Sequence, residues 1–216
     1  MEPGFLIFVK GFIGMLAHIL MEPVHSPRRL PLTQRWLSIL IAILMLMASG
    51  PASAEIGGRY IMRDHLGNVV YDKDFEGKFQ LITFGYTFCP DICPTQLQTT
   101  ADALALLTPE QLAQVVPIFV SVDPERDTPS VLRDYVATFH PAIIGLSGTP
   151  QLTDRIIGLY KVKVAKVPSS TGDPDMYTMD HTAGAFLMGP DGKYIAKIPH
   201  ASTPEQMVER LRTFIK

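Results

Sequence analysis

The sequence has few cysteines and no excess of basic residues, and each shortage narrows what the protein can be. Only two of its 216 residues are cysteine, Cys89 and Cys93. A disulfide between residues this close would remove little entropy from the unfolded chain, because that gain grows with loop length. The formal net charge is -2, so the chain lacks the clustered basic field that displaces counterions from nucleic-acid phosphates. A purely stabilising disulfide and a nucleic-acid partner are both disfavoured.

The length and composition fit one globular domain preceded by an export segment. With 216 residues and 47% hydrophobic content, the chain can bury a core without the help of disulfides or metals. No internal repeat or low-complexity tract follows Glu55. We therefore predict an N-terminal export segment at residues 1–54 and a single domain at residues 55–216.

The export segment has the features of a secretory signal peptide. Arginines precede an uncharged apolar run at residues 36–48, and small residues with an Ala-x-Ala ending at Ala54 follow it, which predicts cleavage after Ala54. The alternative is an uncleaved anchor, because no charge occurs from Trp36 to Ala54 and a membrane span needs about 20 apolar residues. Signal peptides usually have about 15–30 residues, so we hypothesise that translation begins at Met21 rather than Met1.

Proline after threonine marks four predicted helix starts. The threonine hydroxyl can cap the helix, and proline suits the first helical position because its missing N–H would have no partner there. The pairs are Thr108-Pro109, Thr128-Pro129, Thr149-Pro150 and Thr203-Pro204. Cys93-Pro94 predicts a fifth start, with Cys93 in the capping position.

Short β-prone runs between these starts predict strands. They are Tyr60–Met62 and Val69–Tyr71 in a small hairpin, Phe79–Phe84, Val116–Val122, Ile143–Leu146, and a second hairpin of Ala183–Met188 and Lys193–Ile198. Residues 168–180, rich in Pro, Ser, Gly and Asp, are predicted to be an exposed loop. The order of elements indicates an α/β thioredoxin-like fold, with a central mixed sheet flanked by helices and an N-terminal β-hairpin extension.

The two cysteines lie between the first core strand and its helix. A thiol at a helix N-terminus is close to unpaired backbone N–H groups and the positive end of the helix dipole, which favours the thiolate. We therefore expect Cys89 and Cys93 to be reactive. Thioredoxin-type enzymes have two residues between their cysteines, whereas here there are three. This wider spacing allows either a redox disulfide or two sulfurs directed at one metal ion.

A metal site needs at least one further ligand, and the predicted domain contains four histidines. His65 lies in a predicted turn, His140 in a helix-to-strand connection and His200 at a strand end, where a solvated imidazole is expected. His181 begins a strand predicted to lie beside the cysteine-bearing strand. Two cysteines and one imidazole are a soft set of low coordination number, which suits copper, especially Cu(I), whereas structural zinc normally takes four protein ligands.

Several motifs in one order resemble the SCO/SenC family over about residues 56–216. They are Gly57-Gly58, Asp64, Gly67, Asp72, Asp74-Phe75, Gly77-Lys78, the run from Phe84 to Pro94, the run from Ser121 to Pro129, and Asp180-His181-Thr182. An ordered set of this kind is far more specific than any single motif.

The resemblance implies a thioredoxin-fold copper chaperone in the bacterial periplasm or the corresponding mitochondrial space. Cys89, Cys93 and His181 match the family's copper ligands, with copper as Cu(I) or Cu(II). The implied role is delivery of copper to the binuclear copper site of cytochrome c oxidase, with a copper-accepting apoprotein, expected to be subunit II, as partner and an upstream copper donor. The domain would be soluble after cleavage near Ala54 or tethered to the inner membrane, as most family members are tethered.

Two other functions are compatible with the cysteine pair. The first is a thiol-disulfide oxidoreductase, in which Cys89 and Cys93 form a redox-active dithiol that reduces partner cysteines before metallation. The second is a thiol peroxidase, which is disfavoured because Cys89 lacks the upstream proline setting expected of peroxiredoxins. Replacing His181 separates metal binding from dithiol chemistry.

Residues near these motifs have simpler expected roles. Thr128 is expected to cap a helix, and Arg126 to pair with Asp123 or Asp127, with a supporting role for Asp123 at the metal site as a weaker alternative. Tyr86 and Phe88 are expected to shield the cysteines from water. Met176 and Met179 are interpreted as adaptable apolar side chains rather than copper ligands.

Overall fold

The computed structural model describes residues 55–170, 173 and 176–215. The predicted signal peptide, its cleavage site, the alternative anchor and the start at Met21 lie outside these residues. Within the described part of the chain, none of the helices has the length and apolar character needed to cross a membrane.

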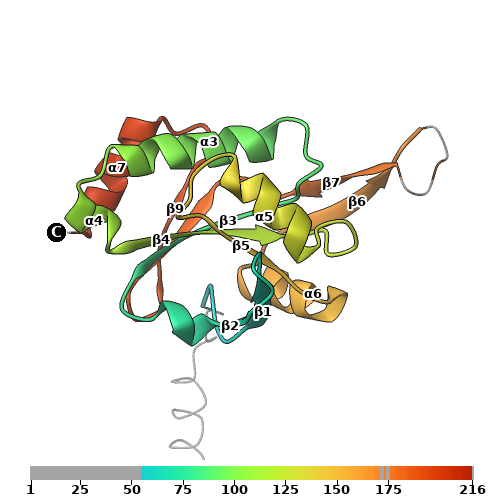
Figure 1. Cartoon of the computed structure of the whole chain (residues 1–216), viewed down its shortest axis with the longest axis horizontal. Helices are drawn as coiled ribbons and strands as arrows, with labels where there is room; N and C mark the ends of the chain where they lie inside the picture. Colours follow the sequence, from blue (N-terminus) through green and yellow to red (C-terminus); the bar gives the residue numbers. More distant parts are fainter. Residues whose placement is uncertain (1–54, 171–172, 174–175, 216) are drawn as a thin grey trace, which may run out of the picture. The chain divides into compact units, whose positions relative to one another are not determined.

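A seven-stranded mixed sheet is the centre of the domain (Figure 1). Its order is β2-β1-β5-β4-β3-β8-β9. The strands are β1 (Ile61–Asp64), β2 (Val69–Tyr71), β3 (Phe79–Gly85), β4 (Val115–Ser121), β5 (Ile144–Ser147), β8 (Ala185–Met188) and β9 (Tyr194–Ile198). β3, β4 and β5 are parallel, whereas β1 pairs antiparallel with β5 and β8 with β3. The predicted thioredoxin-like fold is confirmed, with the N-terminal hairpin joined to the sheet through β1.

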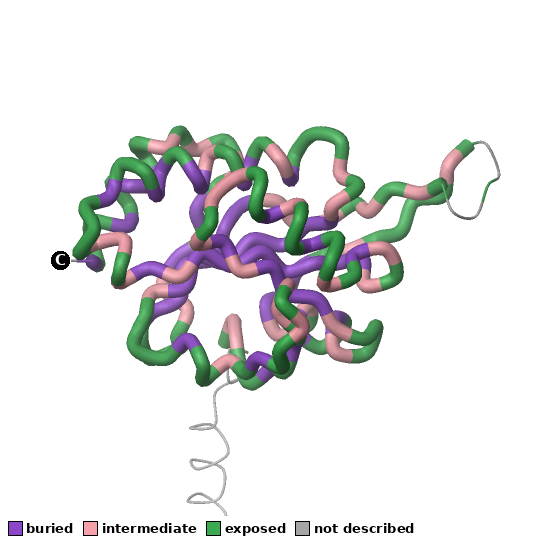
Figure 2. Tube along the Cα trace, in the orientation of Figure 1, coloured by how far each residue is buried: buried purple, intermediate pink, exposed green. Residues whose placement is uncertain are grey.

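Both faces of the sheet are buried, as Figure 2 shows along its central strands. Successive strand residues point to opposite faces, so Leu81 packs with α3 (Ile92–Ala105) and α7 (Pro204–Arg212), while Ile82 packs on the other side in a cluster that contains Ile156 of α6 (Pro150–Leu159). This arrangement buries β3 on both sides, and the strand that leads to the cysteines is therefore held rigidly.

The four helix starts predicted from Thr-Pro pairs are confirmed. Each threonine hydroxyl accepts a hydrogen bond from the backbone N–H three residues on, at the starts of α4 (Pro109–Leu112), α5 (Pro129–Ala137), α6 and α7. The fifth prediction is wrong in detail, because Asp91 is the N-cap of α3 and Cys93 lies inside its first turn. Pro94 is tolerated there because the first four N–H groups of a helix have no intrahelical partner.

The prediction of a loop at residues 168–180 is wrong at both ends, where Pro168 and residues 177–180 belong to a hairpin. β6 (Val164–Pro168) pairs antiparallel with β7 (Tyr177–His181) in a separate two-stranded sheet, so His181 ends β7 instead of beginning β8. The turn-rich composition belongs to the connection between the two strands. Gly184 then turns the chain into β8 with a φ of +95°, where a Cβ would lie 2.6 Å from the carbonyl oxygen of Ile198.

Candidate metal centre

The two cysteines lie at the carboxyl end of β3, where the chain enters α3. The backbone N–H of Cys93 donates a hydrogen bond to the Sγ of Cys89 at 3.4 Å. Both thiols are free, with Cys93 only 1% exposed and Cys89 half-buried. Cys89 is therefore the sulfur that a second molecule can reach more easily.

His181 completes the predicted cluster from the end of the β6–β7 hairpin. Its Nε2 lies 3.1 Å from the Sγ of Cys93, and the candidate ligand atoms of Cys89, Cys93 and His181 all lie within 4.8 Å of one another. Among the histidine, cysteine and acidic side chains that the structure describes, these three form a group whose ligand atoms are close enough to bind one ion. Residues 88 positions apart are brought into contact because β8, which follows His181, pairs with β3.

The surroundings of His181 select the tautomer that a metal requires. The ring Nδ1 lies 3.3 Å from the carbonyl oxygen of Thr182. A carbonyl can only accept, so Nδ1 carries the proton and Nε2 presents its lone pair to the cysteines. Burial lowers the pKa of His181 below its ordinary value, which keeps the imidazole neutral at neutral pH.

The expectation that the helix dipole favours a thiolate at Cys93 is wrong for the protein without metal. Burial raises the pKa of this thiol, and the hydrogen bond with Cys89 acts in the same direction. Removing the sulfur from water disfavours its charged form, and burial is the largest cause of the raised pKa. Cys93 is therefore a protonated thiol at neutral pH until a cation replaces its proton.

The two aromatic residues beside the cysteines differ in their exposure. Tyr86 is buried and meets the His181 ring edge-on, with ring centroids 6.1 Å apart, so it shields the site as predicted. Phe88 is 60% exposed and does not. Met176 is 56% exposed, whereas Met179 packs against the core, in keeping with the interpretation of Met179 as an apolar side chain.

The other three histidines of the domain have partners elsewhere. The Nδ1 atoms of His65 and His140 accept hydrogen bonds from the backbone of Gly145 and Ala142, and His200 lies 3.2 Å from the amide oxygen of Gln96. None of the three belongs to the Cys89, Cys93 and His181 cluster of the described residues.

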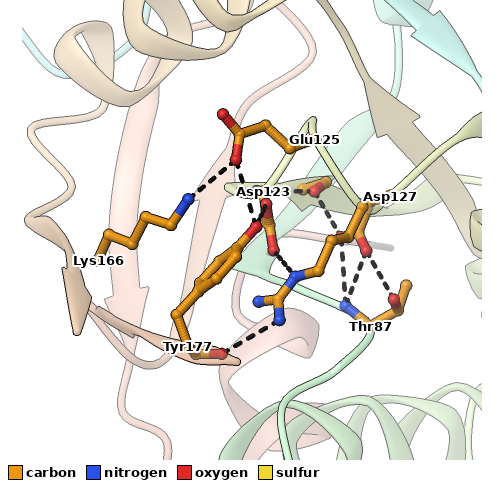
Figure 3. Close-up of polar contacts among 8 residues, drawn as sticks. Thr87, Asp123, Glu125, Asp127, Lys166 and Tyr177 are labelled. Atoms are coloured by element: carbon orange, nitrogen blue, oxygen red, sulfur yellow. Dashed lines mark hydrogen bonds and ion pairs between the residues drawn. The ribbon is translucent and has the colours of Figure 1, made fainter. Parts of the chain in front are cut away.

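The turn between β4 and α5 has polar side chains that contact Thr87 and Tyr177 (Figure 3). Arg126 pairs with Asp123, one of the two predicted partners, with Nε 2.5 Å from Oδ2. Asp127 is fully buried and accepts hydrogen bonds from the hydroxyl groups of Thr87 and Ser121, each at 2.6 Å. Sequence reasoning missed the bond between Asp127 and Thr87 and the role of Tyr177, because these partners lie 40 and 54 residues apart.

Gly85 is a further residue that sequence reasoning missed, because only the packing shows why it must be small. A Cβ at Gly85 would lie 2.8 Å from the Sγ of Cys93 and 2.8 Å from a ring carbon of Phe119. We expect Gly85→Ala to lower the free energy of unfolding by about 1–3 kcal/mol through overpacking, as measured by thermal or urea unfolding.

A matched glycine replacement controls for the general effect of adding a methyl group. A Cβ at Gly158 of α6 would meet no atom within 4 Å, so Gly158→Ala is expected to stabilise the protein by roughly 0.5–1 kcal/mol. An unchanged unfolding midpoint in Gly85→Ala would mean that the backbone does not need to approach Cys93 this closely.

Comparisons with known sequences point to one group of proteins. A model of the SCO1/SenC family matches residues 48–216. The SCO2-like protein of Rickettsia felis is 35% identical over 160 residues, which are 74% of this chain and 77% of that protein. The human mitochondrial SCO1 homolog is 36% identical over 143 residues, 65% of this chain and 46% of that protein.

Solved structures of the same group have a similar fold. The copper-bound ScoI of Bradyrhizobium japonicum is 42% identical, with a TM-score of 0.67, and the match covers 74% of this chain and 99% of that one. Copper-bound yeast Sco1 is 31% identical, with a TM-score of 0.68 and coverage of 74% and 88%.

Proposed function

Because this chain belongs to the SCO1/SenC family, we propose that it is a copper metallochaperone whose ligands are Cys89, Cys93 and His181. The observation that carries the proposal is the convergence of two sulfurs and one ring nitrogen within 4.8 Å. The copper-bound relatives support copper as the cargo.

The chemistry of the three side chains suits a copper ion that must later be released. Thiolate and imidazole are soft or borderline ligands that favour copper, and hard cations prefer oxygen ligands. Three protein ligands leave room for an incoming ligand from an acceptor. The half-buried Cys89 gives such a ligand a side from which to enter, while the buried Cys93 is kept from solvent.

The partner that fits this role is a copper-accepting apoprotein in cytochrome c oxidase assembly, and within it the binuclear copper site of subunit II. The support is that the chain belongs to the SCO1/SenC family, whose members are associated with this assembly step. We further propose export through residues 1–54, as a cleaved signal or as a tether, which places the domain outside the cytoplasm.

A dithiol function of the same two cysteines is the second candidate. The free thiols at the start of α3 and the 3.4 Å contact between the Cys93 N–H and the Cys89 sulfur favour it. The more exposed Cys89 would attack a partner disulfide and Cys93 would resolve the mixed disulfide, with both electrons coming from the two thiols.

Replacing His181 tests the copper proposal against the dithiol function. We expect His181→Ala to weaken Cu(I) retention more than about 100-fold, because loss of an outer-shell partner alone costs about 10–100-fold. Competition with a coloured Cu(I) chelator measures the affinity. The rate at which an oxidant closes the Cys89–Cys93 disulfide should remain within a few-fold of that of the unmodified protein, since the two thiols are retained.

His140→Ala is the matched control, because His140 lies outside the cluster. It should leave copper affinity unchanged. If His181→Ala and His140→Ala bind Cu(I) equally well, the three-ligand site is wrong and the dithiol function becomes the better account of the cysteines.

A further inference from the structure

The turn at residues 123–127 contacts both parts of the candidate metal site. One part is the segment that enters α3 and carries the two cysteines, and the other is the β6–β7 hairpin that carries His181. These parts come from distant regions of the sequence, so their relative position must be fixed by tertiary contacts. The turn supplies such contacts to each of them.

On the hairpin side, Arg126 and Asp123 hold Tyr177, the first residue of β7. The Arg126 guanidinium lies 3.6 Å from the centre of the Tyr177 ring and donates a hydrogen bond to the Tyr177 carbonyl at 3.1 Å. The Tyr177 hydroxyl donates to Asp123 at 2.9 Å. Figure 3 shows Tyr177 enclosed by Asp123, Glu125 and Lys166. Both ends of the tyrosine are therefore fixed to one turn.

On the cysteine side, Asp127 holds the segment that precedes Cys89. It accepts hydrogen bonds from the backbone N–H of Thr87 at 3.2 Å and from the Thr87 hydroxyl at 2.6 Å. Arg126 also lies over the Phe88 ring, 4.8 Å from its centre. The consecutive residues Arg126 and Asp127 thus reach the hairpin and the cysteine segment at the same time.

The hairpin depends on such contacts because its two strands form a sheet of their own. A two-stranded sheet is at best marginally stable in water. Tyr177, Met179 and His181 share one side of β7, since alternate residues of a strand point the same way. Fixing Tyr177 at one end of this short strand therefore limits how far His181 can move at the other end.

We propose that Arg126 and Asp123 are positioning residues that, through Tyr177, hold His181 against Cys89 and Cys93. The effect of this positioning on copper affinity rests on the proposed function. Its effect on the mobility of the hairpin does not. Loss of the contact with Asp123 allows β7 to separate from the turn, and His181 then spends less time within bonding distance of the sulfurs. A ligand that is in place for a smaller fraction of the time binds with a correspondingly lower affinity.

Tyr177→Phe is the test variant, because it removes only the hydroxyl that bonds Asp123 and, at the longer distance of 3.4 Å, Glu125. Tyr194→Phe makes the same chemical change on β9 and is the matched control. We expect Tyr177→Phe to lower Cu(I) affinity by about 10–100-fold, the range seen for outer-shell partners, with no change in Tyr194→Phe. In the copper-free protein, the amides of residues 178–181 should exchange hydrogen faster in Tyr177→Phe only.

A double-mutant cycle with His181→Ala shows whether Tyr177 acts through His181. Once His181 is absent, Tyr177→Phe should cause no further loss of Cu(I) affinity. Arg126→Lys, which keeps the charge but loses the forked geometry, should reproduce the effect of Tyr177→Phe and provides the test if that variant does not fold.

The outcomes separate the two proposals. Unchanged copper affinity and unchanged exchange in Tyr177→Phe overturn the positioning role, as does an equal loss of affinity with and without His181. If His181→Ala has no effect on copper but Tyr177→Phe still increases exchange in β7, the ligand set is wrong and the turn still holds the hairpin.

Discussion

Replacing Cys93 with serine is expected to abolish tight copper binding and dithiol oxidation together. Cys93 is next to both other candidate ligands. Its buried sulfur lies 3.1 Å from His181 Nε2, and its backbone N–H donates a hydrogen bond to the Cys89 sulfur. Serine has nearly the same shape, but its hydroxyl is a hard and weakly acidic group that suits copper poorly. The expected loss of Cu(I) affinity exceeds the roughly 100-fold effect of an outer-shell change.

Competition with a Cu(I) chelator measures the copper affinity of Cys93→Ser, and thiol titration measures its dithiol oxidation. Circular dichroism checks that the variant folds. Thr95→Ser, on the same helix and with its hydroxyl on the Asp91 carbonyl, is a conservative control that should keep both activities. Retention of copper within tenfold by Cys93→Ser would show that Cys93 is not a ligand.

The affinity for Cu(I) is expected to rise steeply with pH from mildly acidic to neutral solution. Burial raises the pKa of Cys93, so at neutral pH its proton must leave when copper binds. Each proton released contributes about a tenfold gain in affinity per pH unit, as long as the pH is below the pKa of that thiol. The raised pKa therefore extends this dependence above the pH range of an ordinary thiol.

His181 should contribute little to that slope near neutrality. Burial lowers its pKa, so the imidazole is already neutral and releases no proton on binding. In His181→Ala, the affinity should be lower at every pH, with nearly the same slope between about pH 6.5 and 8, a range that lies above the ordinary histidine pKa. An affinity that stays flat over this range in the unmodified protein would contradict protonated Cys93 as a ligand.

The ligand set also indicates how copper is released. Acid favours release, because protons compete with copper for the sulfurs of Cys89 and Cys93 and for the ring nitrogen of His181. At neutral pH, protonation of the ligands does not assist the transfer of copper to an acceptor. Transfer there depends on competing ligands that approach through the more exposed Cys89.

Local chemistry explains which parts of the fold could be predicted. A threonine hydroxyl caps a helix only three residues away, so the four Thr-Pro starts follow from neighbouring residues. The strand β3 follows from its apolar run and the mixed sheet from the order of elements. The β6–β7 hairpin was missed because both strands are short, β6 is mostly exposed, and the position of the hairpin depends on Tyr177 meeting a turn about 50 residues earlier in the sequence.

The sequence by itself determined that two thiols lie together at the start of a helix, because only three residues separate them where a predicted strand gives way to a predicted helix. It also named His181 as the third ligand through motifs that resemble a family. Only the tertiary structure decided that Nε2 of His181 faces Cys93, that burial raises the pKa of the Cys93 thiol, and that Thr87 and Tyr177 meet one turn. These features depend on solvent exclusion and on contacts between distant segments, which no local pattern of residues contains.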